Sequence, residues 1–114
     1  MNDWREREVE NETRSRTINE WIDDSNETSG GAASPFLCEC SNQACASTIA
    51  LTHLEYEEVR SDGRHFAIAT DHEAPDLDVL VSQRIGFAIV AKLPGLPARL
   101  AEASDPRKGR RTTW

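Results

Sequence analysis

The sequence lacks a long apolar run, and it lacks an even set of cysteines. No stretch approaches the ~20 apolar residues that a membrane-spanning helix needs. The first six residues, MNDWRE, contain no apolar stretch of the kind found in a secretory signal. The three cysteines are an odd number, whereas a secreted disulfide framework uses an even one. These absences predict a reduced, cytoplasmic protein that makes no contact with a membrane.

Basic residues are also in short supply. The chain carries 20 Asp and Glu against 13 Lys and Arg, which gives a formal net charge of −7. Such a field repels phosphate backbones and disfavours polybasic contact with a membrane. The basic residues are not interleaved with aromatic ones, as they are in many nucleic-acid-binding surfaces. We therefore predict that the protein does not bind nucleic acid.

Composition divides the 114 residues, which have room for one domain at most, into four segments. Residues 1–29 are polar and charged, and a Ser-, Gly- and Ala-rich linker follows at residues 30–35. Residues 36–95 form the predicted zinc-binding core, which is small enough to benefit from a metal staple. Residues 96–114 are predicted to be a disordered tail. Its basic run, RKGRR, is expected to be solvated, with contact to an acidic partner or nucleic acid as the alternative.

The N-terminal segment is expected to form a helix over about residues 7–24. Acidic and basic residues stand four apart along it, which supports a solvated helix. Its apolar stripe consists of Ile18, Trp21 and Ile22, so we expect the C-terminal end of the helix to dock. Two interpretations stay open: a partner-binding or dimerising helix, or a helix that lies on its own domain. With so little apolar surface, residues 1–29 are predicted to be dispensable for folding.

The core segment has the patterns of an α+β protein. Thr52 and Glu55 match a capping box and predict a helix that begins there. Pro75, with two aspartates close behind it, predicts a second short helix over residues 75–81. Strands are predicted at residues 48–51, 65–69 and 85–90. The expected fold is an N-terminal helix plus a small three-stranded sheet with two short helices, stapled by zinc. Helical connections of this length would permit parallel strands.

Three cysteines gather within eight residues, in the run FLCECSNQAC. In an extended segment, residues i and i+2 point the same way, so Cys38 and Cys40 can present both sulfurs to one ion. Four small or amide-bearing residues follow and suit a tight turn that returns Cys45 to the same point. Tetrahedral zinc takes four ligands, commonly four cysteines or three cysteines and a histidine. The cluster therefore predicts a zinc site, with ordinary buried thiols as the alternative.

The fourth ligand is predicted to be His72, because it lies in an irregular stretch where a loop can bend toward a metal. The other histidines, His53 and His65, fall at the beginning of a predicted helix and a predicted strand. Three cysteines and one histidine can also hold a two-iron cluster, so an iron–sulfur centre stays open as the alternative cofactor.

The run CECSNQACASTIALTHLEYEEVRSD, the later His-Glu pair and the strand at residues 85–90 resemble a family of small, mostly uncharacterised actinobacterial proteins. In that family a CEC…C segment precedes an I-x-L-T-x-x-E-Y-E-x-V-R helix and a Gly-His-Glu loop. Asp71 stands here where the family tends to have glycine. The resemblance covers roughly residues 11–106 and implies a functional set, but no activity. That set is Cys38, Cys40, Cys45 and His72.

We expect a small zinc-binding protein that acts as a non-catalytic interaction or regulatory module with a protein partner. A thiol-based redox or metal sensor is the first alternative, because zinc thiolates release their metal on oxidation. A metal- or thiol-dependent enzyme is the second. The HExxH motif of zinc proteases and the Cys-x-x-Cys signature of zinc deaminases do not occur, so an enzyme is the less favoured interpretation.

Overall fold

The structure is a computed structural model, and it describes residues 4–27, 31–42 and 44–108. The predicted α+β class is confirmed: a long N-terminal helix, a three-stranded sheet and two short helices are present, together with a two-stranded sheet that was not predicted. In chain order the elements are α1 (Trp4–Asn26), β1 (Ser34–Leu37), β2 (Thr48–Leu51), α2 (His53–Val59), β3 (His65–Ile68), β4 (Asp78–Gln83), β5 (Ala88–Lys92) and α3 (Leu96–Ala103).

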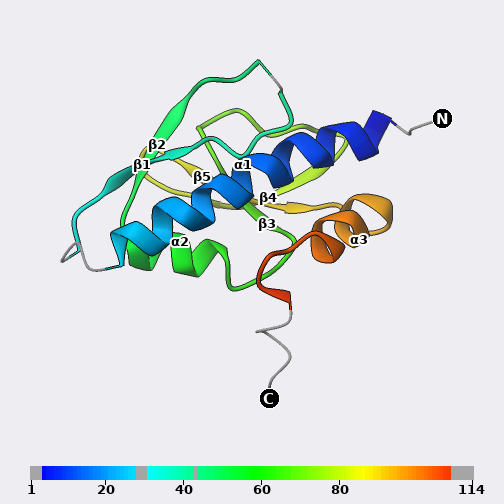
Figure 1. Ribbon diagram of the computed structural model, residues 1–114. Coiled ribbons are helices and arrows are strands. Elements are labelled where there is room, and N and C mark those ends of the chain that lie inside the picture. The colour runs from blue at the N-terminus through cyan, green and yellow to red at the C-terminus, as the bar shows by residue number, and fades with distance from the viewer. Residues whose placement is uncertain (1–3, 28–30, 43, 109–114) are drawn as a thin grey trace.

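The strands form two antiparallel sheets. β1 pairs with β2, with Phe36 opposite Ile49. The second sheet has the order β3-β5-β4, so β5 lies in the centre, and Phe66 of β3 stands opposite Val90. Every strand pair in the described part of the chain is antiparallel, so the parallel arrangement that the sequence permitted is not used. Figure 1 shows α1 crossing in front of the sheets, with α2 and α3 along its lower side.

Successive side chains of a strand point to opposite faces of a sheet, and in β3 and β5 both sets are largely buried, whereas β4 is mostly exposed. One face packs on the two-stranded sheet and α2, where the rings of Phe36 and Tyr56 stack 4.7 Å apart. The other face packs against two of the cysteines and α3. The first cluster contains Phe36, Ile49, Leu51, Tyr56, Val59, Ala67, Phe87 and Ile89. The second contains Cys38, Cys40, Phe66, Ile68, Ala88, Val90 and Ala101.

Helix α1 docks through its polar face, not its apolar stripe. Trp21 is 69% exposed and Ile18 is 38% exposed, so the predicted docking of these two side chains is wrong. Ile22 alone of the stripe packs against the first cluster. Of the two interpretations left open by the sequence, the structure agrees with a helix that lies on its own domain. Its buried residues are Val9, Glu12, Arg16, Asn19, Glu20, Asp23 and Asn26.

The buried charges of α1 are paired across the fold. The Lys92 ammonium of β5 pairs with Glu12 of α1 and with Asp78 of β4, and all three side chains are buried. The Arg16 guanidinium donates to the carbonyls of Gly63 and Ala101, each at 2.8 Å. Removing one partner of a buried ion pair is strongly destabilising because the other charge stays buried. These contacts argue against the expectation that residues 1–29 are dispensable for folding.

Residues 75–81 do not form the predicted helix. Strand β4 occupies Asp78–Gln83, and both Leu80 and Val81 are about half exposed, so they do not form a buried helical stripe. The β-branched side chains and the pairing with β5 favour the strand over the helix start at Pro75. The next predicted strand begins later, at Ala88, because a turn precedes it in which Ile85 is fully exposed.

The C-terminal part of the chain is more ordered than predicted. Helix α3 fills Leu96–Ala103, with a proline in its first turn and Ala101 buried against the sheet. Arg107 forms ion pairs with α1 and α2, so the basic run is not simply solvated. Residues 109–114 lie outside the described part.

At the other end of the core, β1 begins at Ser34, inside the predicted linker. No helix in the described ranges is both long and apolar enough to cross a membrane.

Candidate metal centre

Cys38 and Cys40 lie on the extended segment that follows β1, and this segment runs along the free edge of β3. The Glu39 amide donates to the carbonyl of Ala67 at 2.8 Å, and the Ala69 amide donates to the Cys38 sulfur at 3.1 Å. The alternation predicted from the Cys-Glu-Cys pattern is present. The two cysteines face the candidate centre, and Glu39 points into the protein on the other side.

Cys45 returns to the same point through a turn built by Asn42. The Cys45 amide donates to the Asn42 carbonyl at 3.0 Å. The Asn42 side-chain oxygen accepts from the Ala44 amide, also at 3.0 Å, which is the local bonding that suits asparagine to turns. Cys45 is half-buried, whereas Cys38 and Cys40 are buried. The tight turn that the sequence predicted therefore brings the third thiol to the other two.

His72 reaches the cysteines from the turn that follows β3. Its amide donates to the Ala69 carbonyl at 3.1 Å, and Asp71 just before it has a φ of 68°. That angle lies in the left-handed region, which glycine adopts freely and aspartate tolerates better than most residues. The backbone here accepts either residue and directs the imidazole inward.

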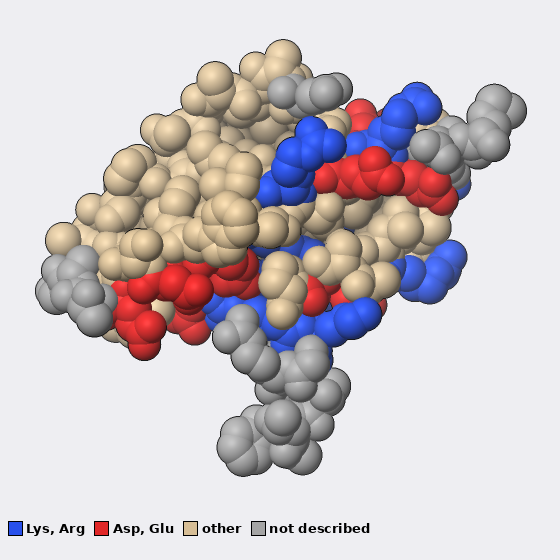
Figure 2. Space-filling model, in the orientation of Figure 1, with Lys and Arg blue, Asp and Glu red and all other residues tan. Residues whose placement is uncertain are grey.

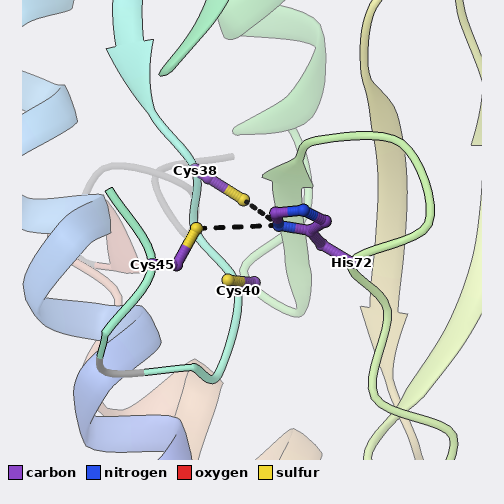
Figure 3. Close-up of side chains that lie close together, drawn as sticks. All are labelled: Cys38, Cys40, Cys45 and His72. Carbon is purple, nitrogen blue, oxygen red and sulfur yellow. Dashed lines mark hydrogen bonds between the residues drawn. The ribbon is translucent and has the colours of Figure 1, made fainter. Parts of the chain in front are cut away.

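The four predicted residues come together in the structure. One possible ligand atom from each of Cys38, Cys40, Cys45 and His72 lies within 4.8 Å of the others. The Nδ1 atom of His72 is 3.4 Å from the Cys38 sulfur and 3.6 Å from the Cys45 sulfur. Zinc bond lengths of ~2.3 Å to sulfur and ~2.0–2.1 Å to nitrogen, at tetrahedral angles, place sulfur and nitrogen ligands about 3.6 Å apart. Figure 3 shows the thiols converging on one side of the ring. The group is compatible with metal binding.

The other two histidines lie elsewhere. His53, at the start of α2, has its Nδ1 atom 2.8 Å from a carboxylate oxygen of Asp23. His65, at the start of β3, has its Nε2 atom 3.7 Å from Asp62. Neither belongs to the cysteine group. The preference for the loop histidine over the two in regular elements agrees with this geometry.

The thiols share protons in a way that favours one thiolate. The pKa of Cys40 falls to about 5, chiefly because the Cys38 thiol donates a hydrogen bond to it. The same hydrogen bond, together with burial, raises the pKa of Cys38 well above the usual range. Deprotonation of a second thiol would place two negative charges side by side, which a cation stabilises. A divalent metal supplies the positive charge, and the thiols that coordinate it lose their protons.

Glu39 anchors the cysteine segment and takes no part in the centre. Its buried carboxylate accepts from the Tyr56 hydroxyl at 2.6 Å, the Asn19 amide at 2.8 Å and the Ala67 amide at 2.9 Å. Asn19 also exchanges two hydrogen bonds with the backbone of Leu37. Burial raises the pKa of Glu39. The sequence did not identify Asn19 or Tyr56 as partners of this segment, because residues of these types form hydrogen bonds in many settings and have no pattern that indicates a partner.

A polar groove opens onto the sulfurs from the side of α1. It is lined by Asn11, Arg14 and Ser15 of the helix, by Asn42 and by all three cysteines. The groove leaves the thiols within reach of small molecules, although the two first cysteines are themselves buried.

No protein-family model, curated protein or solved structure matches this chain. The resemblance to the actinobacterial family thus stays an expectation carried by its motifs, and the assignment of the centre depends on geometry and ligand chemistry.

Proposed function

We propose that this protein is a small, non-catalytic zinc-binding module in which Cys38, Cys40, Cys45 and His72 hold one structural Zn²⁺. One observation carries the proposal: four soft or borderline ligand atoms from two separate segments lie within 4.8 Å of one another. The separations of 3.4 and 3.6 Å between His72 Nδ1 and the sulfurs of Cys38 and Cys45 are close to those around a tetrahedral ion.

The geometry favours a single ion over an iron–sulfur cluster. A two-iron cluster places the ligands of its two irons on opposite sides of the cluster, farther apart than a set in which every ligand atom lies within 4.8 Å of every other. Three thiolates and one neutral imidazole give a zinc site of net charge −1 with four protein ligands. Catalytic zinc keeps an open position, so this ligand set supports a structural role.

The interaction role is supported by the exposed apolar stripe of α1. Trp21 and Ile18 are exposed and, with Ile22, line a groove that reaches β1 at Ser34. Large apolar side chains beside a groove are typical of surfaces that bind proteins. We propose that a protein partner inserts an apolar side chain there. In a pull-down from the source cell, Trp21→Ala should lose the partner. Trp4→Ala, at the other end of the same helix, should retain it, and equal recovery with both variants would contradict the surface.

A thiol-based redox sensor is the alternative that a specific observation favours. The groove lined by Asn11 and Arg14 reaches the sulfurs, and Cys45 is the most accessible of them. Exposure makes a thiolate more susceptible to oxidation. Zinc release by a low dose of hydroperoxide, reversed by a thiol reductant, would favour the sensor. Release only at doses that unfold the protein would favour the structural module. We propose the cytoplasm as the compartment, because its reducing conditions keep cysteine thiols free to bind a metal.

X-ray absorption at the metal edge of the purified protein tests the ligand set directly. The proposal predicts three sulfur atoms at about 2.3 Å and one nitrogen at about 2.0–2.1 Å from zinc. An absorption edge of iron, with a short iron–iron distance, would support the iron–sulfur cluster in place of zinc. A zinc ion bound by oxygen and nitrogen alone would contradict the cysteine centre.

A further inference from the structure

A second group of potential metal ligands lies where α1 meets α2. It consists of Asp23, His53 and Glu57, and one ligand atom from each lies within 4.8 Å of the other two. His53 and Glu57 stand four residues apart on α2 and therefore share a face of that helix. The Asp23 carboxylate, 1% exposed, approaches His53 Nδ1 to 2.8 Å. None of these residues belongs to the cysteine centre.

The two carboxylates of this group already bind a cation, which is the guanidinium of Arg107. Its Nη2 atom lies 3.3 Å from Asp23 and 2.7 Å from Glu57, and its Nη1 atom donates to Glu57 at 3.0 Å. Glu20 accepts from the Nε and Nη2 atoms of the same guanidinium. Figure 2 shows a band of acidic side chains at the lower left of this face, with basic side chains against it. The basic residue that was expected to be solvated thus finds its acidic partner within its own chain.

The group includes a ligand atom, the imidazole nitrogen of His53, that a guanidinium does not coordinate. One imidazole nitrogen and two carboxylates form a ligand set for zinc, manganese or cobalt, and a guanidinium cannot bind the imidazole nitrogen as a metal does. Glu20 also pairs with Arg60, so Arg107 is the guanidinium that faces Asp23 and Glu57, and a divalent ion would balance those two carboxylates better than its single charge does. The side chains of His53 and Glu57 are 24% and 39% exposed, which leaves the ion a path from solvent.

We infer that Asp23, His53 and Glu57 form a second, divalent metal site, and that Arg107 competes with the metal for its two carboxylates. Metal binding then releases the C-terminal segment that begins after Asp105 from α1 and α2. Because the two cations exclude each other, the coupling is reciprocal: whatever loosens Arg107 tightens the metal, and the metal loosens Arg107 by the same factor. The site is independent of the cysteine centre and of its proposed role.

The test is a titration of the zinc-loaded, full-length protein with Co²⁺, followed by calorimetry and visible absorption. Thiolate ligands favour zinc, so Zn²⁺ keeps the cysteine centre when Co²⁺ is added. We expect one further equivalent of Co²⁺ whose spectrum has no sulfur-to-cobalt charge-transfer band. His53→Ala should lose this equivalent, and the control His65→Ala should keep it. No further equivalent, or one that survives in His53→Ala, would overturn the inference. A sulfur-to-cobalt band would instead report on the cysteine centre.

Competition by Arg107 is tested in the same titration. Arg107→Gln should bind the second Co²⁺ roughly tenfold more tightly, within the range of about 5–150-fold typical of coupled sites. The control Lys108→Gln, whose ammonium lies on a backbone carbonyl of α3, should leave the affinity unchanged. Circular dichroism shows whether each variant is folded. Arg107→Lys, which keeps the positive charge but loses the planar guanidinium, serves as a second variant. Equal affinity in Arg107→Gln and the wild-type protein would contradict competition.

Release of the segment has its own readout. Trypsin cleaves after Arg107 only when that side chain leaves the carboxylates, since its exposed fraction is 14% in the closed state. Saturating Co²⁺ should speed this cleavage in the wild-type protein and leave it unchanged in His53→Ala, with fragments identified by mass spectrometry. Protection by the metal would contradict the proposed release.

Discussion

The cysteine centre and the buried face of α1 are both polar clusters inside a small protein, but they differ in how far along the chain their partners lie. His72 is 34 residues from Cys38 and 27 from Cys45, and the three cysteines occupy one short run. On the α1 face, Lys92 binds Glu12 across 80 residues, and Arg107 binds Glu20 across 87. The centre therefore joins one short run to a single histidine, whereas the helix face also has contacts that span most of the chain.

The two regions also differ in how specific their residue types are. A set of three thiols and a loop histidine has few possible functions, and metal binding is the main one. Charged residues have many possible functions, and this chain holds 20 acidic and 13 basic side chains. Their pattern along α1 suits a solvated helix as well as a buried ionic face. Chemical type can indicate a candidate metal centre from the sequence, but ion-pair partners follow from tertiary structure.

The largest effect is expected at the centre. Replacing Cys40 with serine removes a buried ligand, and structural zinc contributes on the order of 10 kcal/mol to folding. That amount is comparable to the whole stability of a small domain. We expect the variant to lose zinc and unfold, as seen by circular dichroism and zinc analysis. The control Ser41→Ala changes an adjacent hydroxyl and should keep both. A folded, zinc-free Cys40→Ser variant would show that the fold does not depend on the metal.

The next effect is expected on the helix face. Replacing Lys92 with methionine leaves Glu12 and Asp78 buried without their cation, so the free energy of unfolding should fall by about 3–5 kcal/mol. The exposed Lys108→Met should stay within about 0.5 kcal/mol of the wild-type protein in urea denaturation.

A triple variant separates charge burial from packing in the same network. Glu12→Gln with Asp78→Asn and Lys92→Met removes all three buried charges and should recover much of the loss. If the triple variant is less stable than Lys92→Met alone, the carboxylates are stabilised by something other than Lys92.

The fourth ligand should matter for affinity more than for folding. Losing a group that only orients a metal ligand costs about 10–100-fold in affinity, so losing the ligand itself in His72→Ala should cost more than about 100-fold. Competition with a zinc chelator of known affinity measures the change, and His65→Ala is the matched control. Full-strength zinc binding in His72→Ala would keep the cysteines as ligands and place the fourth ligand at Asp71, Glu73 or water.

Tyr56 links the two regions through Glu39 and should have an intermediate effect. Tyr56→Phe keeps the ring that stacks on Phe36 but removes the hydroxyl that donates to the buried Glu39 carboxylate. Hydrogen bonds to charged groups contribute about 1.5–3 kcal/mol, and the free energy of unfolding should fall by that amount. Asn19, which donates to the same oxygen, provides a comparison in Asn19→Ala. An unchanged free energy of unfolding in Tyr56→Phe would mean that the carboxylate does not need this donor.

The smallest effect is expected at a local, exposed ion pair. The pKa of Asp62 is lowered from 3.8 to about 2, first by the hydrogen bond from the Arg64 side chain. A depressed carboxyl pKa contributes stability above pH 3.8 that is lost as the pH falls toward 2. Asp62→Asn should therefore flatten the acid limb of the stability curve by less than about 1 kcal/mol. Asp76→Asn is the control, and an equal change there would exclude the Arg64 contact as the cause.

Much of the centre and about half of the architecture could be predicted from the sequence. The Cys-Glu-Cys alternation, the turn at Asn42 and the capping box at Thr52 depend on neighbours in the chain, and the structure has all three. Strand β4 was mistaken for a helix because Pro75 marks a local helix start, while pairing with β5 decides the outcome. The docking of α1 and the place of Arg107 depend in part on residues 80 or more positions away, so no local signal could have shown them.

Native mass spectrometry of the untagged protein tests the central claim most directly. We predict one zinc ion per chain, lost on addition of a strong chelator together with the compact charge-state distribution of the folded protein. A metal-free protein that is well folded and indifferent to the chelator would contradict the zinc-stapled centre at Cys38, Cys40, Cys45 and His72.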